Sequence, residues 1–165
     1  SASPCRPVWP RRWWLKWRDN PIAPSKITTM VKIFVVSEYS LNPPEDGQGR
    51  VKIAKGPLYD LARVQRLATA GGLNTWTDRC DKAVYELFSG DLEAVAGLLG
   101  HLRPADYRDS EWCTNGRNAL AACDAYALRR LEWVASAGKE MGVEYFVKFA
   151  VGKAGQLVLL VSCHL

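Results

Sequence analysis

Residues 145–163 read YFVKFAVGKAGQLVLLVSC, and this stretch decides the fold class. Segments 145–149 and 157–163 are rich in aromatic and β-branched side chains, which are typical of strands. Between them, GKAG at 152–155 predicts a turn. The stretch therefore predicts an antiparallel hairpin.

Three helices are expected before this hairpin. Over 58–68, apolar residues recur every three or four positions and end at Gly71-Gly72, which is typical of a helix and its stop. Thr77 and Asp91 are suited to cap the N-termini of two further helices, and the last of these ends near His101. Helices followed by a hairpin predict an α+β fold, with N-terminal helices packed on a small antiparallel sheet.

Other segments are less decided. Residues 31–36 and 50–54 read as two short strands that can form a hairpin beside the main domain. Residues 119–137 are ambiguous, because their alanines, leucines and arginines favour a helix. We therefore divide the chain into 1–29, a leader; 30–56, a strand pair and loop; and 57–165, the main domain.

The net charge of +5 belongs to the leader. Residues 1–29 carry six basic side chains and one acidic one, whereas the other 136 residues carry 16 of each sign. The leader also holds four tryptophans and five prolines. Indole rings and arginines can contact nucleic acid or a membrane surface. Prolines every few residues favour the alternative of a disordered leader.

Cysteine usage and hydropathy indicate a cytoplasmic protein. The five cysteines are scattered without a CxxC pair, so neither a disulfide framework nor a zinc finger is predicted. Apolar runs stay far below the roughly 20 residues that a membrane-spanning helix needs. We expect no membrane association, no metal and no cofactor.

Five short motifs, taken in order, resemble the MqsR (motility quorum-sensing regulator) family of toxins. They are LYDL at 58–61, DYRDS at 106–110, DAY at 124–126, FVKF at 146–149 and LVSCH at 160–164. The family pattern reads roughly YDL, DFYKS, QDVY, YVKF and SFK at these places. The resemblance implies a RelE-like toxin architecture, a strand at 123–126, metal-free cleavage of messenger RNA, and an antitoxin protein as partner.

The resemblance also predicts a divergent site. The lysine of DFYKS falls on Asp109, and the glutamine of QDVY falls on Cys123. The tyrosine of YVKF falls on Phe146, next to Tyr145, and the lysine of SFK falls on His164. All four family positions for catalysis are therefore altered.

Residues that can rebuild the chemistry remain. RNA cleavage without a metal needs a base for the 2′-hydroxyl, an acid for the leaving oxygen and cations for the phosphate. His164 can act as base or acid, and Asp109 can orient it or act as base. Candidates for phosphate binding are Arg108, Lys148, Arg129 and Arg130. Tyr107 and Tyr145 can stack on a base or donate a proton.

Each candidate has a structural alternative. His164 can be a solvated strand end, and Lys148 can mark the solvent face of a strand. Arg129 and Arg130 can lie on the solvent-exposed face of a helix, and Tyr107 and Tyr145 can be packing residues. His101 fits a helix C-terminus, where its charge favours the dipole.

Two functional hypotheses follow. The first is an RNA-binding, toxin-like endoribonuclease of a bacterial toxin–antitoxin module, with RNA as substrate. The second is a catalytically inactive relative that binds an antitoxin, RNA or another protein. The sequence does not decide the oligomeric state.

Overall fold

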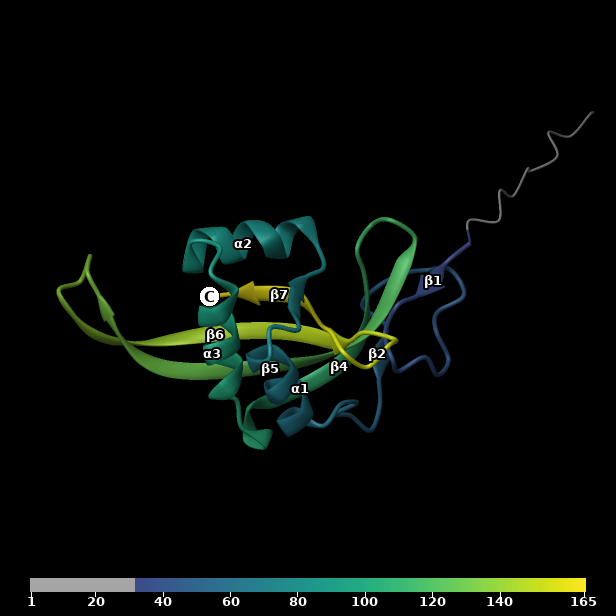
Figure 1. Ribbon diagram of the computed structural model, residues 1–165, viewed down its shortest axis with the longest axis horizontal. Coiled ribbons are helices and arrows are strands. Elements are labelled where there is room, and N and C mark those ends of the chain that lie inside the picture. The colour runs from purple at the N-terminus through teal and green to yellow at the C-terminus, as the bar shows by residue number, and fades with distance from the viewer. Residues whose placement is uncertain (1–31) are drawn as a thin grey trace, which may run out of the picture. The chain divides into compact units, whose positions relative to one another are not determined.

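Strands from both ends of the described chain meet in one mixed sheet. The structure is a computed structural model, which describes residues 32–165 as one unit; the predicted leader at 1–29 lies outside them. Within these residues the sheet has seven strands, in the order β2-β4-β5-β6-β7-β3, with β1 paired to β5 (Figure 1). In chain order the elements are β1 (Phe34–Val35), β2 (Lys52–Ile53), α1 (Leu61–Thr69), β3 (Leu73–Thr75), α2 (Asp78–Phe88), α3 (Leu92–Gly100), the 3-10 turn η1 (Pro104–Asp106), β4 (Tyr107–Thr114), β5 (Ala119–Val134), β6 (Lys139–Val151) and β7 (Val158–His164).

The predicted architecture of N-terminal helices on a small antiparallel sheet is wrong, and so is the RelE-like toxin architecture that the resemblance implied. The three helices lie in the middle of the chain, after β1 and β2. The sheet is also mixed, because β1 runs parallel to β5 and β3 runs parallel to β7. These parallel pairs join segments more than 80 residues apart, so no local sequence pattern predicts the pairing.

The predicted hairpin between 31–36 and 50–54 does not form. Instead, β1 pairs with β5, and β2 pairs with β4 in antiparallel register. Both short strands are thereby part of the central sheet. Behind them, Ile33, Val35 and Ile53 pack against a buried cluster of Trp112, Leu120 and Ala122.

The ambiguous segment 119–137 is a strand, β5, over most of its length. Between Leu120 and Leu128 every residue except Ala125 is buried. Strands β4 and β6 flank this part of β5. Tyr126 and Leu128 lie in the apolar core, and Ala125 lines a hollow on the other face. Tertiary pairing therefore overrides the helix preference of its alanines and leucines.

The predicted helix caps are confirmed. The side chain of Thr77 accepts a hydrogen bond from the N–H of Cys80 at 3.1 Å, and that of Asp91 accepts one from Glu93 at 2.9 Å. The first helix begins at Leu61, three residues later than its periodicity predicts. Asp60 caps it through the N–H of Arg63, at 3.0 Å.

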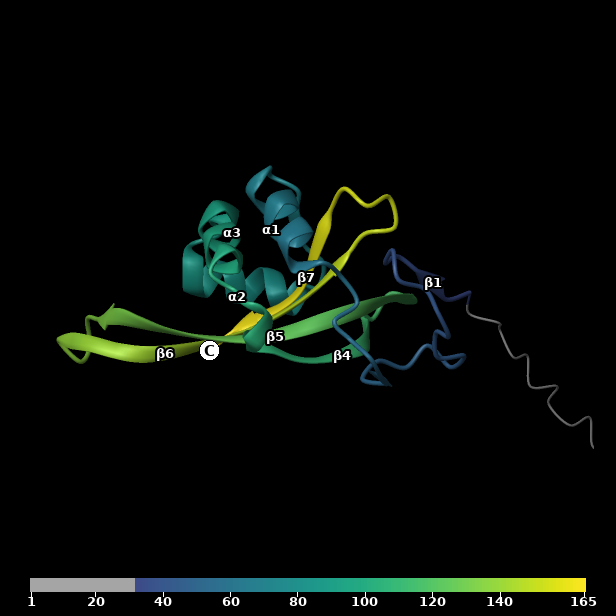
Figure 2. The ribbon, with the colours of Figure 1, turned by 90° about the horizontal axis from the view of Figure 1, so that it is seen from below.

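All three helices gather on one side of the sheet (Figure 2). Val64, Val84 and Val95 are their fully buried anchors, and they share one apolar core with Val147 and Leu160 of the sheet. No helix among residues 32–165 is long and apolar enough to cross a membrane. The other side of the central strands is left without a helical cover.

A buried carboxylate ties the helical layer to the sheet. Asp124 of β5 is fully buried and accepts hydrogen bonds from the backbone N–H groups of Leu58 and Tyr59 and from the hydroxyl of Ser110, at 2.6 to 3.1 Å. Burial raises the pKa of Asp124, and its hydrogen-bond donors lower it only in part. The segment that leads into α1 is thus held by one buried side chain, which solvent does not reach.

We expect Asp124→Ala to lower the free energy of unfolding by about 3 kcal/mol, because two backbone N–H groups and a hydroxyl lose their acceptor. Urea unfolding followed by circular dichroism measures the change. Asp46→Ala is the control: Asp46 is exposed and accepts one hydrogen bond, from Gln48, so its loss should cost no more than about 0.5 kcal/mol. Equal losses in the two variants would contradict this role of Asp124.

Candidate functional site

The face of the sheet opposite the helices carries several of the polar side chains that the sequence singled out. Strand register places Asp109, Ala125, Lys148 and Ser162 side by side across β4, β5, β6 and β7. Because side chains alternate along a strand, residues two positions away share their face. This open face therefore also carries Glu111 and Cys113 of β4, Phe146 of β6 and His164 of β7.

Two adjoining hollows lie on the open face, and together we call them the sheet groove. They have volumes of about 310 and 580 Å³ and share Lys148, Ser162 and His164. The smaller hollow also contains Lys52, Arg108, Asp109 and Phe146. The larger one extends past Glu111 and Cys113 to Arg50 and to the start of α2, at Thr77, Asp78 and Arg79.

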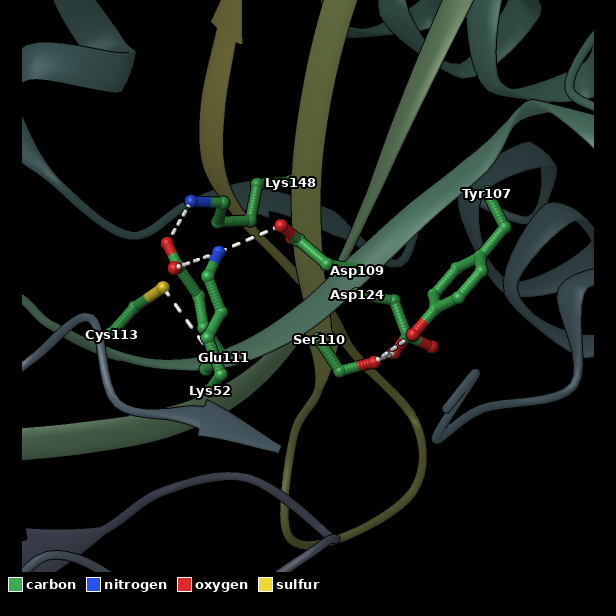
Figure 3. Close-up of polar contacts among 8 residues, drawn as sticks. All are labelled: Lys52, Tyr107, Asp109, Ser110, Glu111, Cys113, Asp124 and Lys148. Atoms are coloured by element: carbon green, nitrogen blue, oxygen red, sulfur yellow. Dashed lines mark hydrogen bonds and ion pairs between the residues drawn. The ribbon is translucent and has the colours of Figure 1, made fainter. Parts of the chain in front are cut away.

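Glu111 is the electrostatic centre of the groove. Its carboxylate is almost completely buried, and it accepts hydrogen bonds from Lys148 and, at 2.7 Å, from Lys52 (Figure 3). Lys52 also binds Asp109 at 2.7 Å. Two lysines and two carboxylates thus form one continuous chain of ion pairs across β2, β4 and β6.

The protonation of this chain follows from its contacts. Burial raises the pKa of Glu111, but hydrogen bonds from Lys148 and Lys52 outweigh burial, so the pKa lies below its ordinary value. Burial lowers the pKa of Lys148, but the bond to Glu111 reverses this and the net shift is upward. The hydrogen bonds to Asp109 and Glu111 raise the pKa of Lys52. Lys52, Glu111 and Lys148 are therefore charged at neutral pH.

The sheet groove has more positive than negative side chains. Its walls hold five basic side chains against three acidic ones, which are Arg50, Lys52, Arg79, Arg108 and Lys148 against Asp78, Asp109 and Glu111. Arg108 is exposed and has no ion-pair partner within residues 32–165. Although residues 30–165 are neutral overall, this face is suited to an anion.

His164 lies at the rim that the two hollows share. Its ring stacks on Phe146, with ring centroids 5.5 Å apart and planes 23° from parallel. One ring nitrogen, Nδ1, lies 3.1 Å from a main-chain oxygen of Leu165. Both rings are exposed, so together they form an aromatic ledge beside the cations.

Of the eight candidate residues, the structure brings four together. Arg108, Asp109, Lys148 and His164 all line the smaller hollow. These residues come from three strands, so only the pairing of β4, β6 and β7 through β5 makes them neighbours.

The other four candidates lie elsewhere. Tyr145 is buried on the helix side, where it donates a hydrogen bond to Glu132 at 2.7 Å, and burial together with this bond raises its pKa to about 12. Tyr107 shares a 2.7 Å hydrogen bond with Ser110, on the Asp124 side of β4. Arg129 and Arg130 lie on the extension of β5, outside the groove lining.

Sequence reasoning missed Lys52 and Glu111. A signal for Glu111 was present but was not used: Asp109, Glu111 and Cys113 alternate along the sequence, so they share a face once this segment is a strand, as β4 is. No sequence signal existed for Lys52, which reaches Asp109 from 57 residues away. Within the described part of the chain, no three His, Cys, Asp or Glu side chains are arranged to bind a metal.

Comparisons with known proteins add no identification. No model of a known protein family matches the chain, and no curated protein sequence matches it either. The resemblance to the MqsR family therefore stays a prediction that rests on the five motifs.

We expect Glu111→Gln to lower the free energy of unfolding at neutral pH by about 2 kcal/mol, because two charge-assisted hydrogen bonds are weakened. The folded-state pKa of Glu111 lies below its ordinary value of 4.5. Its contribution is therefore complete above that value and is lost as the pH falls through the folded-state pKa.

Urea unfolding between about pH 3 and pH 7 measures this dependence. The stability of Glu111→Gln should fall less steeply with acid than that of the unaltered protein. Glu45→Gln, at an exposed loop position, serves as the control. Parallel pH profiles for the unaltered protein and Glu111→Gln would disprove the assignment.

Proposed function

We propose that the sheet groove binds single-stranded RNA and that His164 takes part in cleaving it. The observation that carries this proposal is the meeting of Arg108, Lys148 and His164 in one electropositive hollow. The phosphates of single-stranded RNA bind in positively charged grooves, and its unpaired bases stack on aromatic side chains beside them.

The aromatic ledge supports the choice of a nucleic acid over a smaller anion. Phe146 presents an exposed ring next to His164, and both lie within reach of the Lys148 side of the groove. A base that stacks on this ledge places its phosphate toward the cations. Stacking of one base is worth about 1–3 kcal/mol and does not depend on its identity.

The proposed reaction is transesterification within the RNA. A general base removes the 2′-hydroxyl proton, the 2′-oxygen forms a bond to the adjacent phosphorus, and the 5′-oxygen leaves with a proton from a general acid. His164 serves as the base or the acid, and Arg108 and Lys148 stabilise the charge that builds on the phosphate. Asp109 is held by Lys52, so its part in this scheme is electrostatic.

The resemblance to MqsR toxins agrees with this reaction class, since those proteins cleave messenger RNA without a metal. A bacterial toxin–antitoxin module, an antitoxin partner and a cytoplasmic location belong to the same proposal.

A second candidate is RNA binding without cleavage. It is favoured by Cys123, which stands at a family catalytic position but is fully buried and cannot touch a ligand. On this view the cations and the aromatic ledge remain in use, and the chemistry is lost. Binding and cleavage assays on the same variants separate the two candidates.

We expect the full chain to cleave single-stranded RNA, and we expect His164→Ala to reduce the rate at least about 100-fold, as the loss of a general acid or base does. The chain has two histidines, so His101→Ala, at the exposed end of α3, is the matched control and should cleave normally. Gel analysis of a labelled RNA gives the rates. No cleavage by the unaltered protein, or equal cleavage by both variants, would remove His164 from the mechanism.

We expect Arg108→Ala to weaken RNA binding about tenfold, because one charge-assisted phosphate contact is lost. Fluorescence anisotropy with a labelled single strand, at several salt concentrations, should also give a slope of log affinity against log salt that is shallower by about 0.7. The control is Arg66→Ala, an exposed arginine on α1. Equal affinities for the unaltered protein and Arg108→Ala would contradict RNA binding in the groove.

A further inference from the structure

Beyond the groove, β5 and β6 continue together as a two-stranded extension, which we call the arm (residues 129–134 and 139–144). Strand β4 pairs with β5 only as far as Tyr126, and β7 pairs with β6 only as far back as Phe146. Figure 1 shows the arm reaching past α2 and α3. Within residues 32–165, each strand of the arm therefore has one edge without a backbone partner.

The arm exposes large apolar side chains. Leu131 and Trp133 are 74% and 68% exposed, and Met141 on the opposite face is 40% exposed. A two-stranded ribbon alone is marginally stable in water, and a free strand edge is a template for another strand. These features indicate that the arm gains a partner strand.

We propose that this partner is a second copy of the chain, paired antiparallel along the free edge of β5 about a twofold axis at Leu131. In this register Arg130 lies opposite the partner's Glu132, and Arg129 lies opposite the partner's Trp133. Leu131 meets the partner's Leu131 on the axis. By symmetry, each charged or aromatic contact occurs twice.

The chemistry of these pairs is complementary at every position. Opposite charges placed directly across an antiparallel pair stabilise it, and a guanidinium beside an indole ring adds a cation–π contact. Arg130 and Glu132 share one face of β5, as the 3.6 Å between Arg130 Nε and Glu132 Oε1 indicates. Leu131 and Trp133 share the other face with Arg129 and gain cover from the partner.

The free edge of β6 does not offer this match. In a twofold antiparallel pair that keeps the sheet faces aligned, opposed residues must lie on the same face of the strand. Lys139 shares its face with Met141, Val143 and Tyr145, so it can never oppose a glutamate. Pairing about Gly142 would place Glu140 opposite the partner's Glu144, which is repulsive. The free edge of β5 is therefore the one that fits a second copy.

The experiment uses two charge variants of the full chain, Arg130→Glu and Glu132→Arg. Each places like charges across the axis, so each alone should run as an 18.4 kDa monomer. In a 1:1 mixture, the proposed register pairs glutamates with arginines at both places, so a heterodimer of twice that mass should form. Light scattering after size exclusion measures this, at concentrations up to ~100 μM because one paired strand makes a small interface.

Two further variants distinguish loss of the dimer from loss of the fold. Leu131→Arg alters a side chain that is already exposed and should also be monomeric. Lys139→Glu, on the β6 edge, should dimerise like the unaltered protein. Circular dichroism confirms that each variant is folded. A monomeric unaltered protein, or a mixture that stays monomeric while the unaltered protein dimerises, would overturn the proposal.

Discussion

Strand β5 pairs with β6 at eleven consecutive positions, from Asp124 opposite Phe149 to Val134 opposite Lys139. The same strand pairs with β4 on its other side and with the short β1 at its start. The groove side chains of β6 are positioned through the β5–β6 register, because a slip of one residue would turn Lys148 toward the helices. The buried carboxylate of Asp124 holds β5 against the segment before α1, since it accepts hydrogen bonds from the backbone of Leu58 and Tyr59.

The sheet groove contains both basic and acidic side chains, with the basic ones in excess. Glu111 and Asp109 together balance the charges of Lys52 and Lys148 and hold both lysines in place, while Arg108 is exposed and has no acidic partner among the described residues. A fixed, charged floor with a cationic rim suits a phosphate chain, since the floor needs no rearrangement when the ligand arrives. The aromatic ledge of Phe146 and His164 then supplies the contact that a bare phosphate would not use.

Local signals in the sequence predicted the helices well, together with the strands near the end of the chain. Thr77 and Asp91 cap helices as predicted, because capping depends on a side chain and the backbone two or three residues away, and Asp60, which was not predicted, caps α1 in the same way. The segment 119–137 was ambiguous for the converse reason. Its alanines suit a helix in isolation, and burial between two neighbouring strands decides otherwise.

The sequence by itself determined which side chains could do chemistry, because residue type sets charge, pKa range and stacking ability. It also showed that segments 106–110, 146–149 and 160–164 contain side chains of this kind. Only the tertiary structure decided that Arg108, Asp109, Lys148 and His164 share one hollow, that Lys52 and Glu111 join them, and that Tyr145 is turned away. The physical reason is that cross-strand register and sheet face arise from contacts between distant segments, which no local pattern encodes.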